Sequence, residues 1–302
     1  MKPIISEEIQ RLLACPQCKL PLRYDAGYTC VACGRTFGQT PFGSWDFTMR
    51  YPEFLAPSDR RRWRAGQDAY EDWFKTLPAD DDYEIQLRER NLVSEVYAGA
   101  FSLSGSVLDV GGHRGQLRHF LPEETTYLSV DTCPFVFANL PKLPNLLRAY
   151  PCLSRDCNFA SAEAEYLPLV ANAFDWVNMR SVLDHFLDPA LAIFEAHRVL
   201  RPGGKLLVGV HVTGGKSPLR EGSAVTAVAS RLRRKLKYEG IGATLIASLR
   251  RLMGRAEKDH HIWHPSYDDL LGLLRFAKFS ITKVHWQSPP YDHVVFVMGT
   301  KA

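Results

Sequence analysis

The feature that most constrains this chain's fold is a strand that ends in a glycine-rich turn. Residues 106–110 form a short apolar run, and Gly111-Gly-His-Arg-Gly115 follows directly. A helix is predicted from there through Phe120. Glycines in such a turn let backbone N–H groups approach a ligand at the N-terminus of the following helix. Strand, glycine turn and helix together form the first unit of a doubly wound α/β sheet.

Further elements of the same kind follow along the chain. A second strand is predicted over 126–130 and ends in Asp131, where an acid can accept hydrogen bonds from both hydroxyls of a ribose. Another strand is predicted over 174–178, ending in Asn178. Asp188-Pro189 suits the cap and first turn of a helix. A strand over 205–210, a helix over 266–278 and strands over 279–286 and 293–298 complete an α/β domain.

The motifs carry a family resemblance. Asp109-x-Gly111-x-His113-x-Gly115 looks like the DxGxGxG signature of class I S-adenosylmethionine-dependent methyltransferases of the type 11-like group. Residues 160–168, residues 173–177 and the block Arg198-Val-Leu-Arg-Pro-Gly-Gly204 are similar to later motifs of that family. The resemblance covers about residues 104–301 with one insertion, and it implies a seven-stranded, Rossmann-like sheet. The glycine spacing argues against a nicotinamide oxidoreductase, which would favour GxGxxG.

The resemblance also implies which residues bind S-adenosyl-L-methionine. They are Asp109, Gly111, Gly112, His113, Gly115, Asp131, Ser161, Ala162 and Asn178. Two of them depart from the family pattern. His113 stands where the family has its middle glycine, so its side chain is expected to crowd or contact the methionine end of the cofactor. Ser161 replaces the commoner aspartate, and with Ala162 it takes the place next to the adenine.

Four cysteines near the N-terminus predict a zinc site. Cys15-Pro-Gln-Cys18 and Cys30-Val-Ala-Cys33 can bring four thiolates to one tetrahedral centre. Four thiolates close the coordination shell, so the zinc is expected to be structural and to supply most of the segment's folding energy. Disulfides or a redox site are the alternatives. Residues 14–46 resemble the zinc ribbons attached to several bacterial methyltransferases.

The chain is therefore divided into three predicted parts: a zinc-ribbon module over 1–46, a helical connector or lid over 47–103, and a class I methyltransferase domain over 104–302. The connector is predicted to form helices from Asp59 and over 83–100, which either pack on the domain edge or cover the substrate. The domain carries a helical insertion at 212–263. Between residues 216 and 259 there are eleven Lys or Arg and four acids, although the whole chain has a net charge of only +4. Helices over 231–237 and 241–253 could form a cap, bind an anionic partner such as RNA, or lie on a membrane surface.

Three histidines are candidates for catalysis: His185, His260 and His261. Transfer of a methyl group to a hydroxyl needs a base, and an imidazole titrates in the right range. Packing or capping is the alternative role for each of them.

These features predict an S-adenosylmethionine-dependent methyltransferase that acts on a small-molecule or glycan acceptor, with histidine-assisted deprotonation of a hydroxyl. One alternative is an rRNA or tRNA methyltransferase that grips RNA through the zinc ribbon and the basic insertion. An alternative of another class is a non-catalytic, methyltransferase-like binding protein. No signal-peptide pattern and no apolar run of about 18 residues occurs in the sequence. A cytoplasmic location is therefore expected, with peripheral membrane contact as a possibility and the oligomeric state left open.

Overall fold

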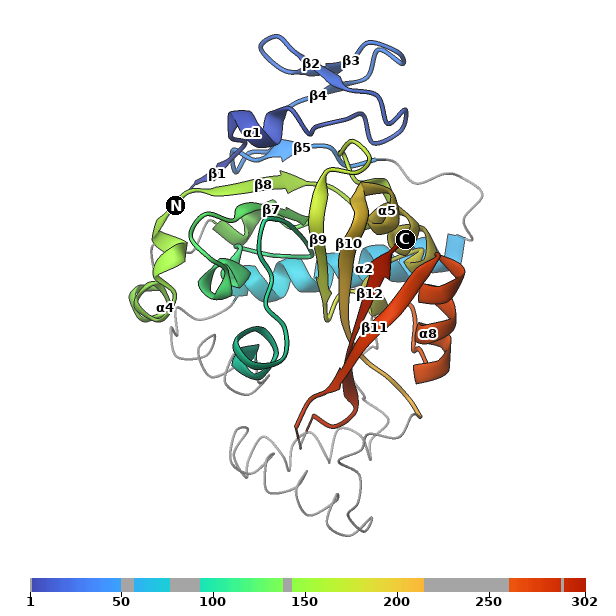
Figure 1. Ribbon diagram of the computed structural model, residues 1–302. Coiled ribbons are helices and arrows are strands. Elements are labelled where there is room, and N and C mark those ends of the chain that lie inside the picture. The colour runs from blue at the N-terminus through green and yellow to red at the C-terminus, as the bar shows by residue number, and fades with distance from the viewer. Residues whose placement is uncertain (1, 50–56, 77–92, 138–142, 215–260, 289–290) are drawn as a thin grey trace.

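The main body of the protein is one twisted sheet with helices on both faces (Figure 1). The computed structural model describes residues 2–49, 57–76, 93–137, 143–214, 261–288 and 291–302. Nine strands form the main sheet in this part of the chain. Eight of them follow the order β1-β8-β7-β6-β9-β10-β12-β11, and β5 also pairs with β8. This architecture confirms the predicted doubly wound α/β class.

The strands of the main sheet are β1 (Pro3–Ile4), β5 (Trp45–Asp46), β6 (Ser106–Val110), β7 (Thr126–Asp131), β8 (Cys157–Ser161), β9 (Phe174–Arg180), β10 (Leu200–His211), β11 (Phe279–Trp286) and β12 (Val294–Lys301). The α-helices are α1 (Glu7–Gln10), α2 (Pro57–Thr76), α4 (Pro144–Ala149), α5 (Pro189–Val199) and α8 (Tyr267–Phe276). The short 3₁₀ or π turns are η1 (Glu95–Ala100), η2 (Gln116–Phe120), η3 (Pro134–Phe137), η5 (Pro151–Ser154), η6 (Ala164–Tyr166) and η7 (Leu183–His185).

The strand order creates a crevice at the centre of the sheet. Strands β6, β7 and β8 follow one another in the chain and lie side by side in the sheet, all parallel. The next strand in the chain, β9, pairs in parallel with the opposite edge of β6. The last pair, β11 and β12, runs antiparallel and joins the sheet through β10. In open α/β sheets, ligands bind outside the carboxyl ends of the strands where the order reverses. That reversal point here lies between β6 and β9.

Alternating side chains give the sheet two apolar faces. Leu108 and Val110 of β6 belong to the larger core cluster, which includes Ala192 and Ile193 of α5. Val107 belongs to a second cluster on the opposite face, together with side chains from η1 and from β12. Because both faces are covered, most side chains of the central strands are apolar, and the polar ones among them, such as Asp109 and Asn178, are buried.

The N-terminal segment forms a small three-stranded sheet and then joins the main one. Strands β2 (Leu22–Tyr24), β3 (Tyr28–Cys30) and β4 (Thr36–Phe37) are antiparallel and lie above β5 and β8 in Figure 1. Strands β1 and β5 then add to β8 in parallel. The predicted seven strands are all present, and this segment extends the sheet to nine.

Several predicted elements match closely. The strands over 106–110 and 279–286 have the expected bounds, and Asp188 caps α5 by accepting the N–H of Leu191 at 2.9 Å. The element after Gly115 is only the short turn η2. The predicted helix over 83–100 is described from residue 93 onward and contains η1. The insertion helices over 231–237 and 241–253 lie outside the described residues, which resume at His261.

None of the helices in the described ranges combines the length and the apolar character that a membrane span requires.

Candidate functional site

A cavity of about 330 Å³ lies at the point where the strand order reverses. Its walls come from the carboxyl ends of β6, β7, β8 and β9 and from one face of α2. The lining residues are Trp63, Gly66, Gln67, Ala69, Tyr70, Val110, Gly111, Val130, Asp131, Thr132, Cys133, Ala162, Glu163, Ala164, Glu165, Ser181, Val182, His185 and Phe186. Small-molecule sites in proteins have volumes of roughly 300–1,000 Å³, so the cavity is large enough for a ligand. Helix α2 of the predicted connector therefore contributes to the site.

Gly111 occupies a position that only glycine fits. Its φ is +69°, and a β-carbon there would lie 2.4 Å from Cγ1 of Val182. Its N–H donates to the carbonyl oxygen of Val130 at 2.7 Å. The turn after β6 therefore keeps its backbone at the cavity wall, as the glycine pattern predicts.

Asp131 lies at the end of β7 and lines the cavity. One of its carboxylate oxygens accepts the N–H of His113 and the other accepts the N–H of Cys133, both at 3.0 Å. These bonds favour the charged form, but burial outweighs them and raises the pKa of Asp131 to about 6. Two carboxylate oxygens offer about four lone-pair positions, so the group retains capacity for the hydroxyls of a ligand.

Asp109 and Asn178 do not line the cavity, although both were predicted to bind the cofactor. They bond to each other, with Asn178 Nδ2 donating to Asp109 Oδ1 at 2.7 Å. Tyr127 donates to Asp109 Oδ2 at 2.7 Å, and Tyr97 donates to Asn178 Oδ1 at 2.9 Å. Burial raises the pKa of Asp109 to about 6. The pair therefore links β6, β7 and β9 directly behind the glycine turn.

His113 and Gly112 contribute through the turn itself. His113 has a φ of +52°, and its N–H holds the Asp131 carboxylate. Burial, and then the neighbouring Arg114, lower the pKa of His113 well below its usual value, so the imidazole is neutral. Neither His113 nor Gly112 is among the cavity-lining residues. Gly115 ends the turn in the left-handed conformation and precedes η2. Contact between the His113 side chain and a cofactor stays a prediction.

Ser161 and Ala162 are partly engaged within the protein. The Ser161 hydroxyl is buried and lies 3.0 Å from that of Ser44. Ala162 lines the cavity, but its N–H donates to the carbonyl oxygen of Asp131 at 3.2 Å. The two donors predicted to face the adenine thus already have partners.

Two buried acids in the cavity wall were not predicted. Glu163 accepts the N–H of Met49 at 2.9 Å, and burial raises its pKa to about 7. Glu165 accepts the N–H groups of Leu187 and Asp188 at 2.8 and 3.1 Å. The available signal was two acids spaced by one residue directly after the end of a strand.

The histidines form a cluster at one side of the cavity. His185 lines it, and the His185 and His261 rings lie 4.5 Å apart between centroids. His261 Nε2 is 3.6 Å from Asp184 Oδ2. His260, the third predicted catalytic histidine, lies outside the described residues. The structure therefore brings two of the three candidates together.

The four N-terminal cysteines also form a cluster. Their sulfur atoms all lie within 4.8 Å of one another, and those of Cys15 and Cys33 are 3.8 Å apart. The Cys18 N–H donates to the sulfur of Cys15 at 3.5 Å. All seven cysteines of the chain are described, and all are free thiols. Four convergent thiols without a disulfide suit a tetrahedral zinc ion.

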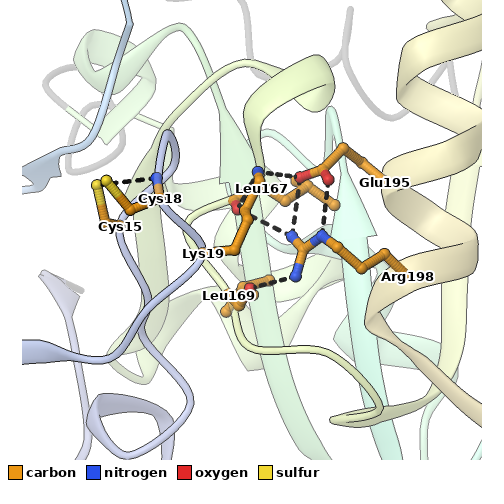
Figure 2. A network of polar contacts seen from close by, with 7 residues as sticks. All are labelled: Cys15, Cys18, Lys19, Leu167, Leu169, Glu195 and Arg198. Carbon is orange, nitrogen blue, oxygen red and sulfur yellow. Dashed lines mark hydrogen bonds and ion pairs between the residues drawn. The ribbon is translucent and has the colours of Figure 1, made fainter. Parts of the chain in front are cut away.

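A polar network fixes the cysteine module to the core, as Figure 2 shows. Lys19 Nζ lies 2.5 Å from Oε2 of Glu195 on α5, and Arg198 binds both carboxylate oxygens of Glu195 at 2.7 and 2.8 Å. The same two cations donate to the carbonyl oxygens of Leu167 and Leu169. Burial lowers the pKa of Lys19, and the adjacent Glu195 opposes that shift. The network ties the first cysteine pair to the segment that follows the cavity acids.

The comparison with known families agrees with this geometry. Residues 108–208 match the family described as methyltransferase domain, a range that holds the glycine turn, Asp131 and His185. Residues 108–208 of the chain are therefore similar to a methyltransferase domain. The seven-stranded, Rossmann-like sheet that the family resemblance implied is present in the structure.

Curated relatives of the methyltransferase domain are distant and partial. A ubiquinone/menaquinone biosynthesis C-methyltransferase, UbiE, of Saccharophagus degradans is 26% identical over 133 residues, which are 42% of this chain and 47% of that protein. The protein of the same name from Agrobacterium fabrum is 31% identical over 105 residues, or 35% and 40% of the two chains. The chain thus spans less than half the length of these relatives. Among solved structures, a putative methyltransferase of Bacillus halodurans is 15% identical, with a TM-score of 0.42 over 70% of this chain and 95% of that one.

Proposed function

We propose that this protein is an S-adenosylmethionine-dependent methyltransferase that acts on a small-molecule or glycan acceptor. The observation that carries the proposal is the Asp131 carboxylate, which is held by two backbone N–H groups in the wall of the cavity where the strand order reverses. An acid at the end of the second strand suits the two hydroxyls of a ribose. The methyltransferase domain match over the same residues supports S-adenosylmethionine as the ligand.

Of the residues around the cavity, one group is proposed to bind the cofactor and the other to bind the acceptor; the cofactor group is as follows. S-adenosylmethionine, when bound, supplies a methyl group that its positive sulfur already activates. Gly111 lets the backbone approach it, and Asp131 anchors the ribose. Trp63 and Tyr70 of α2 line the cavity on the side of that helix. Alignment of the two reactants in one site supplies much of the rate enhancement that such a transfer needs.

The acceptor side is assigned to His185, with His261 beside it. Both imidazoles lie close enough to the cavity wall to handle the proton of an acceptor hydroxyl. The two curated relatives are named as C-methyltransferases, whereas this proposal has a hydroxyl as acceptor. The methylated atom therefore has to be determined by analysing the reaction product. A zinc ion held by the four N-terminal thiolates would have a structural role in this proposal.

Cofactor binding is the first test. Calorimetry with S-adenosylhomocysteine should detect binding to the wild-type protein and a loss of at least tenfold in affinity for Asp131→Ala. Asp25→Ala, which removes an exposed carboxylate on the ribbon hairpin, serves as the matched control and should bind normally. Absence of binding to the wild-type protein would contradict the proposal and favour a non-catalytic binding protein.

The acceptor class is tested with methyl-labelled S-adenosylmethionine and a lysate of the source organism. Label that survives RNase and moves with small soluble or lipid-extractable material is the expected result. Label that RNase releases would refute the small-molecule acceptor and assign the protein to RNA methylation.

A further inference from the structure

A second group of metal-ligating side chains lies beside the cavity, far along the chain from the four cysteines. The group consists of Asp184 and His185 in η7 and His261 in the segment before α8. One potential ligand atom from each of the three side chains lies within 4.8 Å of the other two. An ion can therefore reach all three with small side-chain adjustments.

Hydrogen bonds to backbone carbonyl oxygens hold this group together. The N–H groups of Ile262 and Trp263 both donate to the carbonyl oxygen of Asp184, at 2.8 and 3.2 Å. From the other side, Arg62 of α2 donates to the carbonyl oxygen of His261. The loop that carries His261 is thus fixed against η7 and against the helix that covers the cavity. Such preorganisation is what a metal site needs from its scaffold.

One atom of the group lacks a partner. Asp184 Oδ1 is buried and accepts no hydrogen bond from any residue in the described ranges. The other oxygen, Oδ2, is 3.6 Å from His261 Nε2, which is beyond a normal hydrogen bond. Buried carboxylate oxygens are normally hydrogen-bonded or bound to a cation. A cation between this carboxylate and the two imidazoles would satisfy it.

The donor set identifies the kind of ion. Two imidazole nitrogens and one carboxylate oxygen suit divalent transition metals such as zinc and iron, whereas calcium and magnesium prefer oxygen ligands alone. Three protein ligands also leave coordination positions open, in contrast to the four thiolates of the N-terminal module. His185 is itself part of the cavity wall, so an open position would adjoin the cavity.

We propose that Asp184, His185 and His261 bind a divalent transition-metal ion at the edge of the cavity, and that this ion takes an oxygen atom of the methyl acceptor as a ligand. The second half of the proposal rests on the methyltransferase activity proposed above; the first half does not. Metal ligation changes the role of the two imidazoles, because a nitrogen that binds the ion cannot also accept a proton. Because the ion would bind an oxygen atom of the acceptor, we expect the acceptor to carry a hydroxyl, enol or carboxylate oxygen next to the atom that is methylated.

Metal content separates this site from the cysteine site. The wild-type protein, purified without chelator and reconstituted with Co²⁺, should hold two equivalents per chain. His261→Ala and Asp184→Asn should hold one equivalent while keeping the thiolate-to-cobalt absorption of the cysteine site. His119→Ala, which removes an exposed histidine outside the cavity, should still hold two. A single equivalent in the wild-type protein, or two in His261→Ala, would overturn the proposal.

An oxygen-donor probe tests the open position. Acetohydroxamate should alter the visible cobalt spectrum of the wild-type protein and leave that of His261→Ala unchanged. An unchanged wild-type spectrum would refute the predicted access to the ion. Binding of S-adenosylhomocysteine, measured on the same samples, keeps the two proposals apart. If the wild-type protein holds two metal equivalents but does not bind S-adenosylhomocysteine, the proposed methyltransferase activity is rejected and the metal site stands. If it binds S-adenosylhomocysteine normally but holds one equivalent, the metal site is rejected and the proposed activity stands.

Discussion

Replacing Glu195 by alanine should detach the cysteine module from the core. Glu195 sits on α5, its side chain is only 8% exposed, and its carboxylate accepts from Lys19 and twice from Arg198 (Figure 2). Its removal leaves two cations in a partly buried site without the anion between them. Among the residues that the structure describes, Lys19 and Arg198 then keep the backbone carbonyl oxygens of residues 167 and 169 as partners.

The contacts set the size of the effect. Removal of one partner from a buried ion pair costs about 3–5 kcal/mol. The side chains of Lys19 and Arg198 are 29% and 21% exposed and retain carbonyl partners, so the lower end, about 3 kcal/mol, is expected. Lys19→Met leaves Glu195 bound to Arg198 by two hydrogen bonds and should cost only about 1 kcal/mol. The two variants should thus differ by about 2 kcal/mol.

Urea unfolding followed by tryptophan fluorescence measures both variants in the metal-loaded protein. Glu123→Ala is the control, because Glu123 pairs with Arg155 at 2.9 Å but is 87% exposed. That change should cost no more than about 0.5 kcal/mol. If Glu195→Ala is no more destabilising than Glu123→Ala, the network does not hold the module and the reasoning fails.

Two further predictions concern the cofactor and the metal. Because burial raises the pKa of Asp131 to about 6, most of its carboxyl is protonated at pH 5, and S-adenosylhomocysteine should bind about tenfold more weakly there than at pH 7.5. A raised pKa makes the folded state bind its proton first, so the titration of Asp131 itself favours folding as the pH falls from 6 to 4. Calorimetry at both pH values should find most of this dependence missing in Asp131→Asn; the same dependence in that variant would assign it to another group. Cys18→Ser should remove one metal equivalent and speed tryptic cleavage before residue 46, and an unchanged metal content would reject the four-thiolate site.

The central strands could be predicted because the end of each strand is marked by a recognisable residue type. The glycine turn fixes the end of β6 at Val110, and an acid marks the end of β7 at Asp131. The added strands β1 and β5 could not be predicted, because two residues show no periodicity. They form only because β8 offers an unpaired edge, and that edge is a property of the assembled sheet.

The cavity was less predictable than the sheet. Asp109 lies in the cofactor signature, but its partner is Asn178 of a neighbouring strand, and spacing alone does not show which side of a turn faces the ligand. Glu163 and Glu165 were missed for a related reason. Acids in a loop are usually solvated, and these two are buried only because backbone N–H groups from distant segments reach them. His185 and His261 were both predicted as site residues, but their contact with each other depends on the hydrogen bonds that fix the loop before α8, which the sequence does not show.

The N-terminal module, predicted from the sequence as a separate unit ending at residue 46, is bound to β8, the strand that precedes the cavity acids. Strand β5 pairs with β8 at Ala160 and Ser161, and the Ser44 hydroxyl lies 3.0 Å from that of Ser161. Three residues beyond β5, the N–H of Met49 holds the carboxylate of Glu163, which lines the cavity. The backbone between the cysteine cluster and Met49, and then the hydrogen bond from Met49, therefore connect the cluster to an acid of the proposed active site. We therefore expect that a metal ion that orders the module would also help to hold Glu163 in the cavity wall.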